Sequence, residues 1–157
     1  MALVADRPGH IHRRLVDVIA SRLLEEPVIV LQGPRTVGKS TLLREIAAGR
    51  NARLLDLDDL ATRDAVAADP ALFVAGRDLV CVDEVQHVPA LYDAIKAELN
   101  RDLRPGRFVL TRSTRSDVVP VAAQALTGRM HLLTVYPLSQ GEIAGVRESM
   151  VEELFQD

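Results

Sequence analysis

The sequence predicts an α/β fold in which a mostly parallel, five-stranded sheet carries helices on both faces. Five short apolar runs rich in β-branched residues have the length and composition of buried strands. Segments with apolar residues at helical spacing lie between these runs, and glycine or proline marks most of the boundaries. Strands that alternate with helices in this way form a parallel sheet, because each crossover helix packs onto one of its faces.

The expected elements follow one another with short connections. Leu15, Ile19 and Leu23 share one face of a leading helix, which Pro27 ends. The expected strands cover residues 28–31, 52–57, 79–82, 107–111 and 131–135. The expected helices cover residues 41–48, a segment capped by Asp58 or Asp59, a segment from Asp69–Pro70 to Gly76, one opened by Pro89, and 120–126. A capping box at 139–142 then predicts a last helix with an apolar stripe of Ile143, Val146, Met150, Val151 and Leu154.

Composition indicates one soluble domain over residues 1–157, with 1–26 as a leading helical segment and 139–157 as a terminal helix. No apolar run is long enough to span a membrane and the N-terminus has no apolar signal core, so we expect a cytoplasmic location. Cys81 lies in an apolar run and is expected to be a buried strand residue rather than a reactive thiol. A net charge of −3 and 3% aromatic residues do not indicate a nucleic-acid surface.

A glycine-rich segment lies between the first expected strand and a helix. Residues 33–40 read GPRTVGKS, which fits the phosphate-binding loop pattern G-x-x-x-x-G-K-[ST]. Backbone N–H groups of such a loop surround a phosphate, while Lys39 reaches the β- and γ-phosphates and the Ser40 hydroxyl ligates magnesium. We therefore expect ATP and Mg²⁺ as ligands. The expected nucleotide-binding residues are Gly33, Pro34, Arg35, Thr36, Val37, Gly38, Lys39, Ser40 and Thr41.

Two acidic residues end the third expected strand. Ligands of parallel sheets bind beyond the carboxyl ends of the strands, where the loop, Asp83–Glu84 and residues 111–113 are expected to meet. Asp83 can hold magnesium beside Ser40, and Glu84 can orient and polarise an attacking water. A solvated acidic pair is the better interpretation of these two residues alone, but the loop upstream favours hydrolysis. The acidic run of Asp56, Asp58 and Asp59 resembles a metal cluster, although helix capping explains it better.

Five segments in order carry a family resemblance. They read GPRTVGKSTLL at 33–43, LDLDD at 55–59, VDEVQHVP at 82–89, LTRS at 110–113, and LTGR at 126–129 followed by YPLS at 136–139. These segments span nearly the whole chain and resemble the prokaryotic AAA-type ATPases of the AAA_14 class, which are usually joined to a DUF4143 C-terminal region. The D-E-x-Q-x-x-P segment combined with L-T-x-S is much more specific than the phosphate loop alone.

The resemblance implies a P-loop NTPase core, a three-layer sandwich with strand order 5-1-4-3-2 and a water-polarising Glu84. It also implies that Thr111 or Ser113 occupies the family's sensor position near the γ-phosphate. Arg129 matches the Gly-Arg segment, where a phosphate contact, a subunit contact and a structural ion pair are all open. The expected catalytic residues are Glu84, Lys39, Thr111, Ser113 and Arg129, and the expected metal ligands are Ser40 and Asp83.

The chain departs from the family pattern at Arg112, where the family usually has glycine. A cation at this position is expected to disturb the strand end or to lie close to the phosphates, and Arg112→Gly is expected to raise turnover. The sequence also ends at Asp157 without the C-terminal region of the family. A truncated reading frame, a fragment and a free-standing module are the alternatives.

The expected function is an AAA-type module that binds and hydrolyses Mg-ATP to drive or regulate a partner. One alternative is a truncated nucleotide-binding module with little turnover. Another is a P-loop kinase acting on a small molecule, with Arg112, Arg115 and Arg129 as lid arginines, which the Asp83–Glu84 pair disfavours. The expected partners are ATP and either a second copy of the chain or another protein, and neither a membrane nor nucleic acid is indicated.

Overall fold

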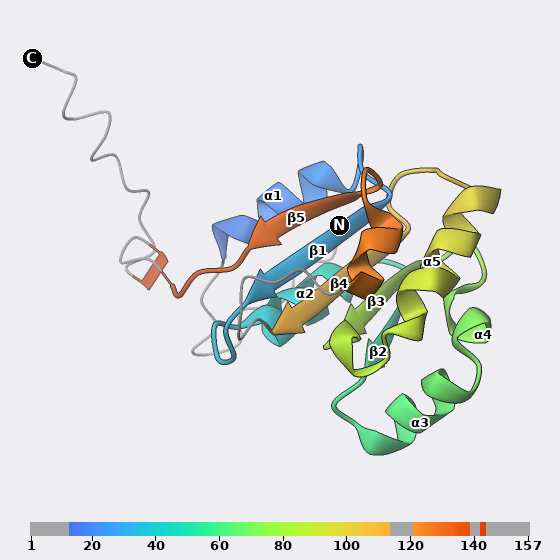
Figure 1. The fold of residues 1–157 in the computed structure, drawn as a ribbon. Coiled ribbons are helices and arrows are strands. Elements are labelled where there is room, and N and C mark those ends of the chain that lie inside the picture. The colour runs from blue at the N-terminus through green and yellow to red at the C-terminus, as the bar shows by residue number, and fades with distance from the viewer. Residues whose placement is uncertain (1–12, 114–120, 139–141, 144–157) are drawn as a thin grey trace, which may run out of the picture.

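Five parallel strands form a single sheet with helices on both of its faces (Figure 1). The computed structural model describes residues 13–113, 121–138 and 142–143. The strand order β2-β3-β4-β1-β5 is the order expected from the sequence, and every pairing is parallel. The strands are β1 (Val28–Gly33), β2 (Ala52–Asp56), β3 (Leu79–Asp83), β4 (Phe108–Ser113) and β5 (Met130–Thr134). The predicted three-layer α/β sandwich is therefore confirmed.

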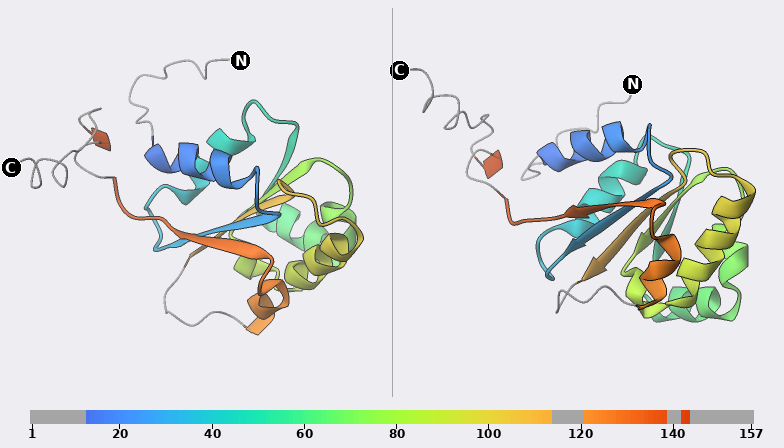
Figure 2. Two further views of the ribbon diagram at one scale, coloured as in Figure 1. Left: turned by 90° about the horizontal axis from the view of Figure 1, so that it is seen from above. Right: turned by 45° about the horizontal axis from the view of Figure 1, so that its top comes forward.

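The helices divide between the two faces of the sheet, as the two views of Figure 2 show. One face is covered by α1 (Arg14–Arg22) and α2 (Lys39–Ala47). The other is covered by α3 (Leu60–Ala68), α4 (Pro70–Val74), α5 (Ala90–Arg101) and the short 3-10 helix η2 (Val121–Leu126). A second 3-10 helix, η1 (Val85–His87), follows β3. None of the helices in the described ranges is long and apolar enough to cross a membrane.

Strand alternation builds a separate core on each face. In β1, Val28 and Val30 pack in the core beneath α5, whereas Ile29 and Leu31 pack in the core beneath α2. Cys81 lies in the second core with no exposed surface. Burial raises the pKa of its thiol to about 12, so the prediction of a buried strand residue is confirmed.

The helix boundaries follow the predicted capping residues. Asp59 accepts a hydrogen bond from the Thr62 N–H at 3.0 Å and caps α3, which confirms helix capping for one member of the acidic run. Asp69 caps α4, and Pro70 is its first residue. The helix expected at 120–126 is a 3-10 helix. The terminal helix expected at 139–157, with its capping box and apolar stripe, lies outside the described residues except for 142–143.

Arg112 lies in a polar row that crosses three neighbouring strands. Its register partner on β1 is Gln32, which in turn pairs with Thr134 on β5. Arg112 Nη2 donates to Gln32 Oε1 at 2.5 Å, and Gln32 Nε2 lies 3.5 Å from Thr134 Oγ1. The guanidinium is buried beneath α5, where burial raises the pKa of the Tyr92 hydroxyl and the positive charge of Arg112 opposes that shift.

The expectation that Arg112 lies close to the phosphates or disturbs the strand end is wrong. Along β4, Leu110 packs in the core beneath α5 and Val109 in the core beneath α2. Successive side chains of a strand alternate, so Arg112 shares the face of Leu110 and Thr111 shares the face of α2. The strand also remains paired with β1 through Ser113.

Arg112→Gly is expected to destabilise the fold without raising nucleotide turnover. The substitution removes a charged hydrogen bond, leaves unfilled space beneath α5 and places glycine inside a central strand. We expect the free energy of unfolding to fall by about 1–3 kcal/mol in chemical denaturation. Arg112→Met, which keeps most of the volume, is the control and should lose less. A stable Arg112→Gly protein with faster turnover would contradict this assignment of the guanidinium to the far face.

Candidate functional site

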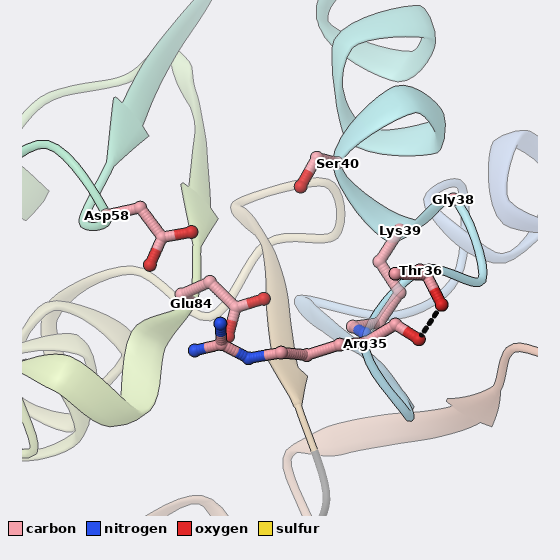
Figure 3. A pocket seen from close by; sticks show the side chains of 7 residues that line it. All are labelled: Arg35, Thr36, Gly38, Lys39, Ser40, Asp58 and Glu84. Atoms are coloured by element: carbon pink, nitrogen blue, oxygen red, sulfur yellow. Dashed lines mark hydrogen bonds between the residues drawn. The ribbon is translucent and has the colours of Figure 1, made fainter.

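The loop that joins β1 to α2 borders a pocket of about 360 Å³ (Figure 3). This volume is typical of small-molecule sites. The pocket is lined by Arg35, Thr36, Gly38, Lys39 and Ser40 from one side and by Asp58 and Glu84 from the other. The fold thus brings five of the expected loop residues together with Glu84, one of the two acidic residues expected at the end of the third strand.

Two glycines permit the backbone path of the loop. A Cβ on Gly33 would stand 2.7 Å from the carbonyl oxygen of Val135, whose own N–H donates to Gln32 at 2.7 Å. Gly38 has a φ of +88°, which glycine adopts without strain. Thr36 also has a positive φ, of 71°, which is uncommon for a β-branched residue. Turns of this kind direct successive N–H groups into one concavity, which is the geometry that binds anions.

Lys39 places a buried positive charge at the first turn of α2. Its Nζ donates to the carbonyl oxygens of Gly33 at 2.9 Å and Pro34 at 2.6 Å, and the residue is only 4% exposed. Burial lowers the pKa of the ammonium, while the negative charges of Glu84 and Asp83 oppose that shift. The N-terminus of the helix adds its own partial positive charge. An anion in the pocket would therefore meet both charges at once.

Four of the expected loop residues, Gly33, Pro34, Val37 and Thr41, are not among the residues that line the pocket. Gly33 and Pro34 supply the carbonyl oxygens that hold Lys39. Val37 packs in the core beneath α2, and Thr41 is exposed on the first turn of that helix. Ser40 lines the pocket, and Figure 3 shows its hydroxyl directed into it.

Strand β4 lies between β1 and β3, and its Thr111 side chain joins the two acidic residues. Thr111 Oγ1 donates to Asp83 Oδ1 at 2.5 Å and accepts from the Glu84 N–H at 2.9 Å. All three residues are buried. Thr111 therefore fixes the end of β3, and through it the direction in which Asp83 and Glu84 face.

Both carboxylate oxygens of Glu84 are held by hydrogen bonds. Ser113 Oγ donates to Oε1 at 2.9 Å, and Gln86 Nε2 donates to Oε2. The backbone of Glu84 has φ 60° and ψ 53°, a left-handed conformation that costs about 1–3 kcal/mol in residues other than glycine. The sequence did not single out Gln86, although it stands in the D-E-x-Q segment that carries the resemblance.

Asp58 is a pocket residue that the sequence analysis treated only as part of an acidic run. Its Oδ1 lies 2.9 Å from His87 Nε2, a contact between the segment after β2 and η1. Neighbouring aspartates cannot be told apart by pattern, and it is Asp59 that caps α3. Within the described ranges, no group of three or more His, Cys, Asp or Glu side chains is arranged to hold a metal ion.

Arg129 lies at the end of the sheet where the strands begin, away from the pocket at their carboxyl ends. It directly precedes Met130, which pairs with Val28 at the start of β1, whereas the loop follows the end of β1. Arg129 Nη1 donates to Asn100 Oδ1 at 2.5 Å near the end of α5. Because β5 and β1 run parallel, the structure does not bring Arg129 to the pocket of its own chain.

Sequence relatives of this chain are found in mycobacteria. It is 34% identical over 119 residues to the uncharacterized proteins Mb2031c of Mycobacterium bovis and Rv2008c of Mycobacterium tuberculosis. The matched part covers 74% of this chain and 26% of each relative. The chain therefore spans about a quarter of the length of these relatives.

Many solved structures share the fold, and two of them bear 16% and 14% identity to this chain. AMPPCP-bound DnaA from Aquifex aeolicus superposes with a TM-score of 0.59 and 16% identity, covering 90% of this chain and 55% of that chain. A DNA replication initiation factor superposes with a TM-score of 0.56 and 14% identity, covering 90% of this chain and 49% of that chain. The family model of the AAA domain, AAA_14, matches residues 25–144, which include the whole sheet and the loop. This chain belongs to the AAA domain family AAA_14.

Proposed function

We propose that this domain binds Mg-ATP at the loop of residues 33–41 and hydrolyses it. The observation that carries the proposal is the buried Lys39 ammonium, whose hydrogen-bond partners among the described residues are two loop carbonyls and which faces the acidic end of β3. An anion that carries its own cation suits such a pocket, and a triphosphate with magnesium has this character. The structural relative DnaA was solved with the nucleotide AMPPCP, which supports a nucleotide as the ligand.

The residues present fit both parts of this ligand. Gly38 offers a backbone that a phosphate can approach closely, and Lys39 can exchange loop carbonyls for phosphate oxygens. Ser40 and Asp83 are the residues that would hold magnesium, which would neutralise charge on the β- and γ-phosphates when bound. Magnesium needs only one or two protein ligands beside phosphates and waters, so a cluster of three acidic residues is not required.

Glu84 is the residue that we assign to the attacking water. Each carboxyl oxygen of Glu84 accepts one hydrogen bond, and a carboxylate is the form of this side chain that can take a proton from water. Each carboxylate oxygen has a further acceptor site beside these hydrogen bonds, which a water can use. Ser113 and Gln86 therefore act on Glu84 as positioning residues, and Thr111 keeps the end of β3 in place.

A binding module with little turnover is the second candidate. The observation that favours it is that Ser113 and Gln86 already bond both Glu84 oxygens, which restricts how the carboxylate can face a water. No observation favours the kinase. Arg112 lies on the far face of the sheet and Arg129 at its far edge, while Arg115 lies outside the described residues. The cellular location and a partner that uses the ATP energy stay predictions.

Lys39→Ala should weaken the binding of a fluorescent ATP analogue by about 10-fold to 100-fold. The variant loses charge-assisted hydrogen bonds to phosphate in a buried setting. Lys96→Ala is the matched control, since Lys96 is the only other lysine and lies on the exposed side of α5. Fluorescence anisotropy with Mg²⁺ present measures both. Equal affinity of the Lys39→Ala and wild-type proteins would refute nucleotide binding at the loop.

Glu84→Gln should keep nucleotide binding and lower phosphate release from Mg-ATP by roughly 100-fold or more, the range for loss of a general base. Phosphate release is measured with no acceptor present, so hydrolysis is distinguished from phosphoryl transfer to a small molecule. If the variant hydrolyses ATP like the wild type, Glu84 does not act on the water. If the wild type binds ATP and releases no phosphate, the binding module is the correct function.

A further inference from the structure

Arg13 lies directly behind the phosphate loop, although it is 20 residues away from the start of the loop pattern. The residue precedes α1 and is 9% exposed. Its Nη1 donates to the carbonyl oxygen of Val37 at 2.9 Å and stands 3.5 Å from the place of a Cβ on Gly38. Nη2 donates to the carbonyl oxygen of Tyr136, beyond β5, at 2.6 Å, and Nε lies 3.5 Å from Glu142 Oε1.

The contact to Val37 controls the direction of the next N–H group. In a planar trans peptide, the carbonyl of residue 37 and the N–H of residue 38 point in opposite directions. A guanidinium that holds the Val37 oxygen outside the loop therefore directs the Gly38 N–H inward, and Gly38 lines the pocket. The same hydrogen bond polarises the peptide and makes its N–H a stronger donor.

Gly38 needs such support more than other loop residues do. Its φ of +88° is accessible to glycine, but glycine also has the widest choice of alternative conformations. The Arg13 side chain reaches two carbonyl oxygens at once, those of Val37 and Tyr136. Arginine has the rigid fork of donors for this, whereas lysine carries a point charge.

We propose that Arg13 is a positioning residue for phosphate binding, which holds the Val37–Gly38 peptide so that the Gly38 N–H donates to a phosphate of the bound nucleotide. This inference rests on the proposed function and extends the site beyond residues 33–41. The same guanidinium joins the loop to Tyr136 and Glu142.

Arg13→Ala tests the role with two readouts. In the protein without nucleotide, the Gly38 amide proton should move upfield in a ¹H–¹⁵N correlation spectrum, because its peptide is no longer polarised. The affinity for the fluorescent ATP analogue with Mg²⁺ should fall about tenfold, as for the loss of one charged hydrogen bond. Arg22→Ala on the exposed side of α1, where Arg22 pairs with Glu25, is the matched control and should change neither.

A purely structural role for Arg13 gives a different result. Arg13→Ala would then lower the melting temperature while the Gly38 resonance and the affinity stay at wild-type values, which would overturn the inference. Loss of binding in Lys39→Ala without loss in Arg13→Ala would leave the proposed function standing and remove this role. A wild-type protein that binds no nucleotide would overturn both. If Arg13→Ala does not fold, wild-type affinity in Arg13→Lys would overturn the inference, since lysine cannot span both carbonyls.

Discussion

The position of β4 between β1 and β3 is the constraint on which the whole site depends. It separates the phosphate loop from Asp83 by one strand and fills that interval with Thr111, whose hydroxyl bonds both Asp83 and the Glu84 backbone. Because all these strands are parallel, their carboxyl ends meet at the same edge. The register that pairs Val30 with Leu110, and Leu110 with Val82, is thus also what brings the loop and the acidic residues to one pocket.

Two buried cations show how the amino ends and the carboxyl ends of the parallel strands differ. Arg107, at the start of β4, is 2% exposed and has carboxylate partners in Glu98 and Asp102, besides carbonyl oxygens and the ring of Phe108. Lys39, near the carboxyl ends of the strands, is hydrogen-bonded to carbonyl oxygens of its own loop. A buried charge is costly unless it is paired, so Glu98 and Asp102 offset the charge of Arg107, whereas an anionic ligand would pair with the charge of Lys39. The contrast is what directs the interpretation of the pocket toward phosphate.

Backbone strain is concentrated at the pocket. The two residues other than glycine with positive φ within the described ranges, Thr36 and Glu84, both line the pocket. Thr111, Ser113 and Gln86 hold Glu84 in its conformation. Such positions persist where the surrounding structure over-determines them, and they cluster at ligand sites. The hydrogen bonds around Glu84 therefore fix its geometry.

The sequence by itself determined the elements and the motif, because both depend on neighbours along the chain. Apolar runs predict the five strands, Asp58 or Asp59 and then Asp69–Pro70 predict two helix starts, and the glycines and Lys39 of residues 33–40 predict a phosphate loop. The strand order was implied by the family resemblance, which the same local segments carry.

Only the tertiary structure decided which side chains lie at the loop, because the relevant contacts join residues far apart in sequence. Strand alternation sends Arg112 to the far face, and the parallel direction of β5 keeps Arg129 at the far edge. Arg13 meets Val37 across 24 positions and Tyr136 across 123, with no local pattern to signal either contact. Periodicity reports the face on which a residue lies within its own element, but a hydrogen bond between elements depends on how those elements pack.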